Sequence, residues 1–587
     1  MSEKRSFFSE LKRRNVYKVA VAYIVGAWAL SQGIAQVFPV FDVPNWAIRS
    51  IVLLIILGFP IAVVFAWFFE ITPEGIKRTE TADAMPQAGR QKNNAWIYVV
   101  VVGAVVSIGL FFLGRYTAGN ATPRQSESAT AVPQKSIAVL PLLNESGDPK
   151  DEYFSDGLSE ELIAALAQIR ELKVIGRSSS FRFKDRKEES KTIGEKLGVS
   201  TLLEGTVRKQ GDRVRIVAEL INAADGIELW SRTFDRELKD IFAVQEEIAN
   251  AVASSLKVTL LGVDERSATK SATKNTEAHN AYLQGHFYLL RRNLEDYRRA
   301  IAHYDEAIRL DPDYALVYAE RSEARIWIGD LSGRGKTELP KARSDAERAV
   351  AIAPALAEAH AALGWLRFFA EWKFAEGLSE LKRAQELSPA NPTTNDLLAR
   401  VIVYVGKLDE AERQARHAVE LDPLSGSAQF NLARVLWCEG KLDEADAVAR
   451  KTAELTPAAA SSHRWQVLIA IKRGDGETAL REAGLEADEN YRRFELALAH
   501  YARRDRAAAD AALAELIAES RDIAAFQIAQ VYAVRGETDK AFEWLQISFD
   551  THDTGTLAIL VDPLLHDLRD DPRYKALVAK MNFPTTS

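Results

Sequence analysis

Residues 329–337 (GDLSGRGKT) come close to a sequence that binds phosphate. A phosphate-binding loop has four residues between its first glycine and the Gly-Lys-Thr triplet, and it follows a β-strand. Here five residues separate Gly329 from Gly335, and the preceding Ile326-Trp-Ile328 ends a predicted helix. We therefore expect this segment to be an insertion between two helices, with no nucleotide site.

A second candidate for chemistry is the set of carboxylates formed by Asp156-Gly157 and Glu160-Glu161, which could act as general acid and base. The same residues also suit a helix start, because Ser159 is a favourable N-cap and acidic side chains favour a helix N-terminus. We expect a turn at the glycine and a helix after Ser159. The single cysteine, Cys438, and nine dispersed histidines match no metal-binding pattern, so we predict no catalytic residue, metal or cofactor.

Length and composition limit the class of protein. At about 150 residues per domain, 587 residues predict three or four domains. Apolar residues make up 47% and charged residues 27%, which excludes collagen-like and wholly disordered chains. The net charge of −7 provides no positive field that would attract nucleic acid, so we expect no nucleic-acid partner.

The carboxyl-terminal half has an internal repeat. Pro389, Pro423 and Pro457 lie 34 residues apart, and the sequence GKLDEA occurs at both 406–411 and 440–445. Thirty-four residues with a proline after the second helix is the period of tetratricopeptide repeats, and residues 277–560 resemble that family. We expect about eight repeats in an all-α solenoid, followed by a capping segment over 561–587.

Such a solenoid has a concave groove lined by the first helix of each repeat. Arg400 and Arg434 are 34 residues apart and should stack in one row, where their planar donor groups suit a carboxylate. We predict a groove that binds an extended acidic peptide or a free C-terminus. The alternative is that the aromatic residues only pack between repeats and the arginines are solvated. The candidate residues are Trp365, Phe369, Asp396, Arg400, Tyr404, Phe430, Arg434 and Trp437.

Residues 136–262 have the pattern of a small α/β domain. Short apolar runs alternate with helical segments, and the turns at 210–212 and 225–226 separate three predicted strands, which gives the order βαβαβββα and a mixed sheet. The runs Ile137–Pro141 and Asp151–Ile163, with Leu203–Val207 and Leu229–Asp235 further along, resemble the amino-terminal domain of TolB-like proteins. The same module occurs in CadC-type regulators. The resemblance implies an interaction or sensing module. It does not imply direct transcriptional control, because no winged-helix domain is found here.

The amino-terminal part contains three charge-free apolar runs, at residues 19–41, 50–69 and 95–114, each long enough to span a bilayer. We predict a basic cytoplasmic segment over 1–18, a three-helix transmembrane region over 19–114 and a linker over 115–135. Lysines and arginines concentrate before the first run and between the second and third, so the N-terminus should be cytoplasmic. The α/β and repeat domains should then be periplasmic, in a multi-pass protein of the bacterial inner membrane.

These features together predict a non-enzymatic membrane adaptor that binds a protein or peptide in the repeat groove. They do not fix its oligomeric state. Residues 7–15 and 71–76 resemble a region of bacterial cyclase-like proteins, so one alternative is a signalling protein related to adenylate or guanylate cyclases, although no cyclase catalytic domain follows the linker. A second alternative is a membrane sensor whose α/β domain binds a small molecule.

Overall fold

The computed structural model describes residues 135–169, 171–184, 188–256, 273–332 and 335–584, together with Tyr23, Phe59 and a short hairpin. The chain divides into two compact units, residues 1–131 and 132–587. In the first unit, β1 (Phe69–Thr72) pairs antiparallel with β2 (Gly75–Arg78). The predicted spans and linker otherwise lie outside the described residues. None of the helices that are described combines the length and apolar character needed to span a bilayer.

The second unit begins with a six-stranded mixed sheet. Its strands follow the order β5-β3-β6-β7-β8, with β4 beside β6. β3 runs parallel to β5 and β6, whereas β6, β7 and β8 form an antiparallel meander. The strands are β3 (Ser136–Val139), β4 (Leu143–Asn144), β5 (Lys173–Val174), β6 (Thr201–Gln210), β7 (Arg213–Asn222) and β8 (Glu228–Glu237). Gly211 and Gly226 have φ of +60° and +70°, as tight turns between these strands require.

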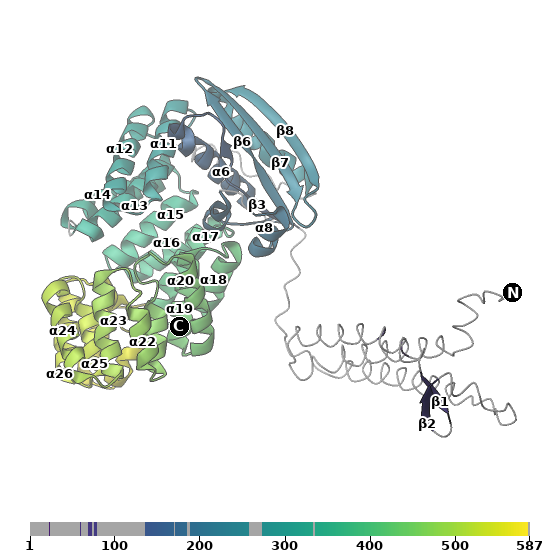
Figure 1. Cartoon of the computed structure of the whole chain (residues 1–587). Helices are drawn as coiled ribbons and strands as arrows, with labels where there is room; N and C mark the ends of the chain where they lie inside the picture. The colour runs from purple at the N-terminus through teal and green to yellow at the C-terminus, as the bar shows by residue number, and fades with distance from the viewer. Residues whose placement is uncertain are drawn as a thin grey trace. The chain divides into compact units, whose positions relative to one another are not determined.

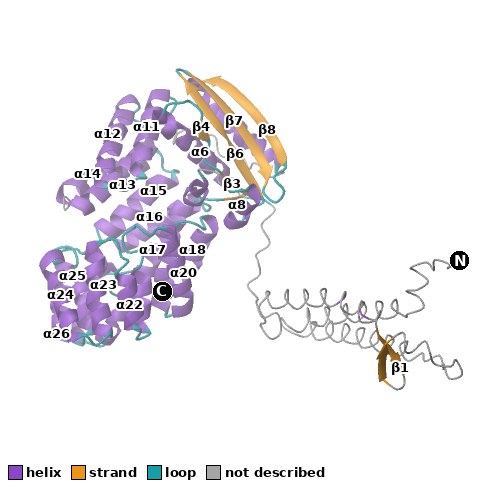
Figure 2. Cartoon of the chain, in the orientation of Figure 1, coloured by secondary structure: helices purple, strands orange, loops and turns teal. Residues whose placement is uncertain are grey.

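Helices cover this sheet as the sequence predicted. α6 (Glu152–Ala167) and α9 (Ile241–Ser255) share a core with Val139, Leu203 and Ile216 on one side. α8 (Ser190–Leu197) packs in a separate core on the other side, and the short α7 (Arg177–Ser180) precedes it. Apart from α7, β4 and short 3-10 turns, the order matches the predicted βαβαβββα and confirms a small α/β region (Figure 2).

The expected helix start at Ser159 is wrong. α6 begins at Glu152, and the Ser159 hydroxyl lies inside the helix, where it donates to the Ser155 carbonyl at 2.7 Å and accepts from the Leu142 amide at 2.9 Å. Gly157 does not make a turn. A Cβ atom there would lie 2.6 Å from Leu283, so glycine allows α6 to approach the first repeat closely.

The repeat region consists of sixteen helices in eight antiparallel pairs among the described residues, which confirms the expected number (Figure 1). The pairs are α11 (Thr276–Leu289) with α12 (Leu294–Leu310), α13 (Ala315–Ser332) with α14 (Gly335–Ile352), α15 (Ala357–Trp365) with α16 (Phe374–Leu387), α17 (Pro392–Tyr404) with α18 (Leu408–Leu421), α19 (Gly426–Glu439) with α20 (Leu442–Leu455), α21 (Arg464–Lys472) with α22 (Gly476–Ala483), α23 (Glu489–Ala502) with α24 (Arg506–Ser520), and α25 (Ala525–Val534) with α26 (Thr538–Asp550).

The expected insertion at 329–340 is mostly helical and is not an extended loop between two helices. α13 continues to Ser332 and α14 begins at Gly335, so the extra residues lengthen both helices of the second repeat. Pro340 lies within α14 near its N-terminal end. It is the sixth residue of the helix, beyond the first four N–H groups that lack an intrahelical acceptor, so it removes one backbone hydrogen bond from α14.

Small residues let paired helices approach each other. A Cβ atom on Gly285 of α11 would lie 2.4 Å from a ring carbon of Tyr304 on α12. Ala411, Ala415 and Ala418 of α18 are fully buried against neighbouring helices. These positions recur with the repeat, so the spacing of small residues in the sequence reflects direct helix contact.

The α/β region packs against the array at two places. α6 contacts α11, where His286 lies between Glu160 at 2.6 Å and Glu320 of α13 at 2.8 Å. Further along the array, the Asp422 carboxylate at the end of α18 accepts from the Ser179 amide of α7 at 2.7 Å. The α/β region therefore bridges the first and fourth repeats.

The far end of the array returns to its third repeat. Trp372, just before α16, lies 5.8 Å from the ring of Phe549 at the end of α26 and 4.5 Å from the ring of His552, just beyond that helix. Phe374 stacks on Phe583 at 4.6 Å. The segment after α26 contains 3-10 turns over Thr554–Ala558 and Pro563–Leu568 and the helix α27 (Pro572–Met581), which agrees with the predicted cap.

Candidate functional site

The candidate residues lie on the first helices of consecutive repeats. α15, α17, α19 and α21 contact one another in sequence, as expected for helices on the inner side of the superhelix. Arg400 of α17 and Arg434 of α19 occupy equivalent positions one repeat apart. Burial lowers the pKa of the Arg434 guanidinium; Tyr404 partly opposes this, and the charges of Arg400 and Arg464 add to it.

Arg400 is held between aromatic rings. Its guanidinium carbon lies 4.7 Å from the ring centre of Trp365 and 4.9 Å from that of Phe369. Both rings belong to the third repeat, and their centres are 3.9 Å apart. The Arg400 Nε atom is buried and has no hydrogen-bond partner within the described part of the chain. The stacking fixes the plane of the guanidinium while leaving a donor unused.

Arg434 repeats this arrangement one unit further on. Its guanidinium carbon lies 5.2 Å from the ring centre of Phe430 and 5.3 Å from that of Tyr404, and Nη1 donates to the Tyr404 hydroxyl at 2.9 Å. Phe430 in turn contacts the ring of Trp465 in the next repeat at 5.3 Å. The aromatic rings and arginines therefore alternate along the row.

Arg464 extends the row and was missed in the sequence. It begins α21 and lies 5.4 Å from the ring centres of both Trp465 and Tyr491, with a buried Nε that has no partner among the described residues. It lies 30 residues after Arg434, about one helical turn before the position that the 34-residue spacing gives, which is occupied by Leu468. The Arg-Trp pair at the start of this helix was the available signal. We call Arg400, Arg434 and Arg464 the arginine row.

The remaining candidates have structural contacts. Asp396 accepts from Ser427 and from Asn431, each at 2.6 Å, and so joins α17 to α19. Trp365, Phe369, Tyr404 and Trp437 are between 2% and 8% exposed, whereas Phe430 and the three arginines are half-buried. As whole residues the arginines are therefore more exposed than most of the aromatic residues beside them, although Nε of Arg400 and of Arg464 is buried.

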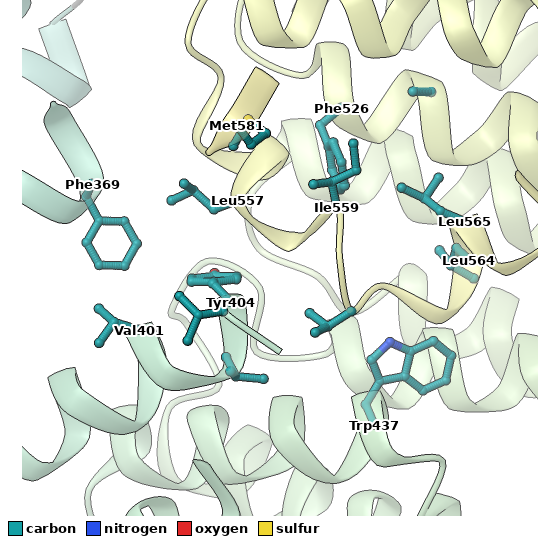
Figure 3. Close-up of a cluster of buried hydrophobic side chains, with 14 of the residues drawn as sticks. Phe369, Val401, Tyr404, Trp437, Phe526, Leu557, Ile559, Leu564, Leu565 and Met581 are labelled. Atoms are coloured by element: carbon teal, nitrogen blue, oxygen red, sulfur yellow. The ribbon is translucent and has the colours of Figure 1, made fainter. Parts of the chain in front are cut away.

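The capping segment packs beside this row. Leu557, Ile559 and Leu564 lie in the same apolar cluster as Phe369, Tyr404 and Trp437 (Figure 3). Asp562 is buried, and its carboxylate accepts from the Gln530 side chain and from the Leu564 amide at 2.8 Å. Burial raises the pKa of Asp562, while the nearby charges of Arg464 and Arg569 partly oppose that rise.

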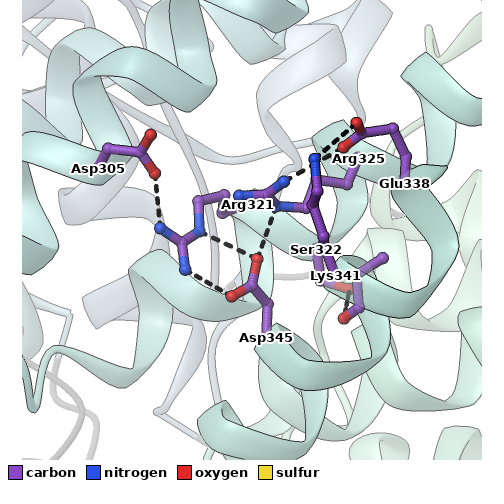
Figure 4. A network of polar contacts seen from close by, with 8 residues as sticks. Asp305, Arg321, Ser322, Arg325, Glu338, Lys341 and Asp345 are labelled. Carbon is purple, nitrogen blue, oxygen red and sulfur yellow. Dashed lines mark hydrogen bonds and ion pairs between the residues drawn. The ribbon is translucent and has the colours of Figure 1, made fainter.

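The arginines of the second repeat differ from the arginine row because carboxylates neutralise them. Arg321 bonds to Asp305 at 2.6 Å and to Asp345 at 2.5 Å, and Arg325 bonds to Asp345 at 2.9 Å (Figure 4). In the described residues, no carboxylate is within ion-pair distance of Arg400, Arg434 or Arg464. Asp562 and Glu495 interact with Arg464 only beyond ion-pair distance. Because neighbouring cations repel one another, the arginine row favours an incoming anion.

Comparisons with known proteins agree with the repeat fold. A tetratricopeptide repeat model matches residues 397–459, which covers most of α17 to α20. The chain therefore carries tetratricopeptide repeats.

A Rhizobium meliloti (strain 1021) protein named "Putative adenylate cyclase 3" is 32% identical over 249 residues. The match covers 41% of this chain and 42% of that protein, so this chain spans less than half the length of that relative.

Among solved structures, pilF of Pseudomonas aeruginosa is 20% identical with a TM-score of 0.29, over 35% of this chain and 93% of that one. YrrB, described as a TPR protein with an unusual peptide-binding site, is 20% identical with a TM-score of 0.25, over 36% of this chain and 96% of that one.

Proposed function

We propose that this protein is a non-enzymatic scaffold whose repeat array binds an acidic segment of a protein partner along the arginine row. The single observation that carries this proposal is the set of three neighbouring guanidinium groups, stacked on aromatic rings and without ion-pair partners among the described residues. Hydrogen bonds between an arginine and a carboxylate are strong and directional. A partner segment with two or more carboxylates, or with an acidic residue beside a free C-terminus, would contact successive arginines.

The experiment is partner capture with a double variant. Proteins cross-linked to the chain in intact cells are identified by mass spectrometry for the unmodified chain and for Arg400→Ala/Arg434→Ala. The variant should lose its principal partner. Arg413→Ala is the matched control, because Arg413 is exposed on α18, the second helix of the fourth repeat. A double variant that keeps every partner contradicts the proposal.

We also propose that the chain is anchored in the bacterial inner membrane through residues 19–41, 50–69 and 95–114, with a TolB-like α/β domain and the repeats in the periplasm. The support is the sequence, since basic residues precede the first apolar run and separate the second from the third. A reporter that is active only outside the cytoplasm, fused after Ser587, tests this orientation. Activity is expected, and an inactive but stable fusion contradicts it.

The relative named as an adenylate cyclase supports a second candidate, in which this chain belongs to a cyclic-nucleotide signalling system. The two candidates separate in one assay. The purified full chain is incubated with ATP or GTP and a divalent cation, and cyclic nucleotide is measured. A scaffold gives no product above the blank, whereas formation of cyclic nucleotide contradicts the non-enzymatic assignment. The sensor alternative predicts instead that a small metabolite raises the melting temperature through the α/β domain.

A further inference from the structure

Strand β8 forms one edge of the six-stranded sheet. It follows β7 in the strand order and has no further strand beside it among the described residues, as the outer arrow in Figure 1 shows. The strand is ten residues long and contains no proline. Ile227 and Leu229 at its start are 60% and 47% exposed. A long edge strand with exposed apolar side chains is a template for pairing with another strand.

The register shows which backbone groups of β8 face away from the sheet. The Leu238 amide donates to the Asp212 carbonyl at 2.7 Å, immediately beyond the pair formed by Glu237 and Arg213. Hydrogen-bonded pairs alternate in an antiparallel ladder, so even-numbered residues of β8 bond to β7. The N–H and C=O groups of Ser231, Thr233 and Asp235 therefore point outward from the edge.

Charged side chains usually protect such an edge, but Arg232, Asp235, Arg236 and Glu237 of β8 have partners within the chain. Asp235 bonds to Arg213 at 2.6 Å and to Arg215 at 2.7 Å. Arg232 and Arg236 each approach Glu247 of α9 at 3.8 Å. These pairs reduce the repulsion that would otherwise keep a second β8 strand away.

We infer that β8 pairs antiparallel with β8 of a second copy of this chain, with Thr233 opposite Thr233. In this register Trp230 faces Arg236 and Ser231 faces Asp235, so no like charges are opposed. Pairing about Arg232 places two arginines opposite each other, and pairing about Phe234 places Arg232 opposite Arg236. Pairing about Ser231 opposes no like charges but joins a shorter stretch of strand. The sequence of β8 thus favours one two-fold arrangement, in which two sheets become continuous.

The test is position-specific cross-linking of the full chain. In the inferred register, Thr233→Cys places two thiols on directly opposed residues, whose Cα atoms are about 5.5 Å apart, a distance that a disulfide can span. Asp225→Cys, an exposed position in the β7–β8 turn, is the matched control. Its two copies would lie about 50 Å apart at 3.3 Å per residue. The unmodified chain, with only Cys438, measures the background.

Thr233→Cys should yield at least fivefold more covalent dimer than Asp225→Cys. A second measurement is the molar mass of the full chain by light scattering at a protein concentration of tens of micromolar, where a dimer is expected. Thr233→Pro removes an outward N–H that the sheet does not use, so the fold should persist by circular dichroism while the dimer is lost. Thr233→Ala should keep the dimer. Equal cross-linking at positions 225 and 233, or a monomeric unmodified chain, would overturn the inference.

Discussion

Glu495 of α23 should make the repeat array less stable as the pH rises above about 4.5. Its side chain is 0% exposed, and neither carboxylate oxygen has a hydrogen-bond partner in the described structure. Burial raises its pKa well above the ordinary value of 4.5; the charge of Glu486 adds to this rise, and Arg464 opposes it. The folded chain therefore retains a proton that the unfolded chain releases above about pH 4.5.

The sign and size of the effect follow from this difference in protonation. Where the folded state binds more protons, the free energy of unfolding falls as pH increases, by up to about 1.4 kcal/mol per pH unit for one group. Between the ordinary pKa of 4.5 and pH 7, the loss reaches at most about 3.4 kcal/mol. Glu495→Met keeps a similar volume and has no titrating group. It should therefore be more stable than the unmodified chain at pH 7, with a smaller difference at pH 4.5.

The assay is the melting temperature of the full chain and of Glu495→Met between pH 4.5 and 8. The difference in melting temperature between the two should grow as the pH rises above 4.5, until the pH reaches the folded-state pKa of Glu495. Glu519→Met on the exposed side of α24 is the control and should change the slope little. Parallel curves, or a Glu495→Met variant that is less stable at pH 7, would refute the assignment of a buried, protonated carboxyl group.

Three further predictions concern packing and the joint between the α/β region and the array. Gly285→Ala should reduce the free energy of unfolding by about 1–3 kcal/mol and lower the melting temperature, because the added Cβ would lie 2.4 Å from Tyr304. An unchanged melting curve would contradict the close approach of the two helices. Asp422→Ala should leave the Ser179 donors unpaired, cost about 1–3 kcal/mol and raise hydrogen exchange over 177–183, with unaltered exchange as the contrary result. His286 should be charged at neutral pH because, although burial lowers its pKa, Glu320 and Glu160 raise it well above 6.5. Its ion pairs then stabilise the fold fully below pH 6.5, and this contribution is lost as the pH rises through the folded-state pKa of His286. His286→Gln should therefore make the melting temperature depend less on pH above 6.5. An unaltered pH dependence would count against a charged His286.

Most of the repeat fold could be predicted because the ends and contact faces of each helix pair are set by residues close together in the sequence. Prolines at a 34-residue interval, GKLDEA turns and buried alanines fix where helices end and which faces meet, and the structure places α17 to α20 accordingly. The order of the α/β elements was also predictable from alternating apolar runs and glycine turns.

The start of α6 was not predicted, because Gly157 suggested a turn. Glycine inside a helix costs about 1 kcal/mol relative to alanine, so it normally counts against one. Here it is required by Leu283, which is distant in sequence. Pro149, capped by Asp148 through the Lys150 amide at 2.8 Å, was an available signal for an earlier start.

The shape of the candidate site depends on contacts that no local pattern encodes. The contact between Trp372 and His552 arises from the curvature accumulated over five repeats. Arg464 lies four residues before the position that the 34-residue period gives, so the period alone does not identify it. The 34-residue spacing correctly placed Arg400 and Arg434 at equivalent positions of α17 and α19, whereas their role in binding stays a prediction.

The central claim is that the arginine row binds carboxylates, and peptide affinity tests it most directly. A labelled peptide ending in several glutamates with a free C-terminus is titrated with the full chain, and its glutamine analogue is the matched ligand. We expect Arg434→Met to weaken binding of the acidic peptide by about tenfold or more, because one charge-assisted hydrogen bond is lost, and Arg413→Met to leave it unchanged. Equal affinity for the acidic and glutamine peptides, or equal effects of the two substitutions, would contradict it.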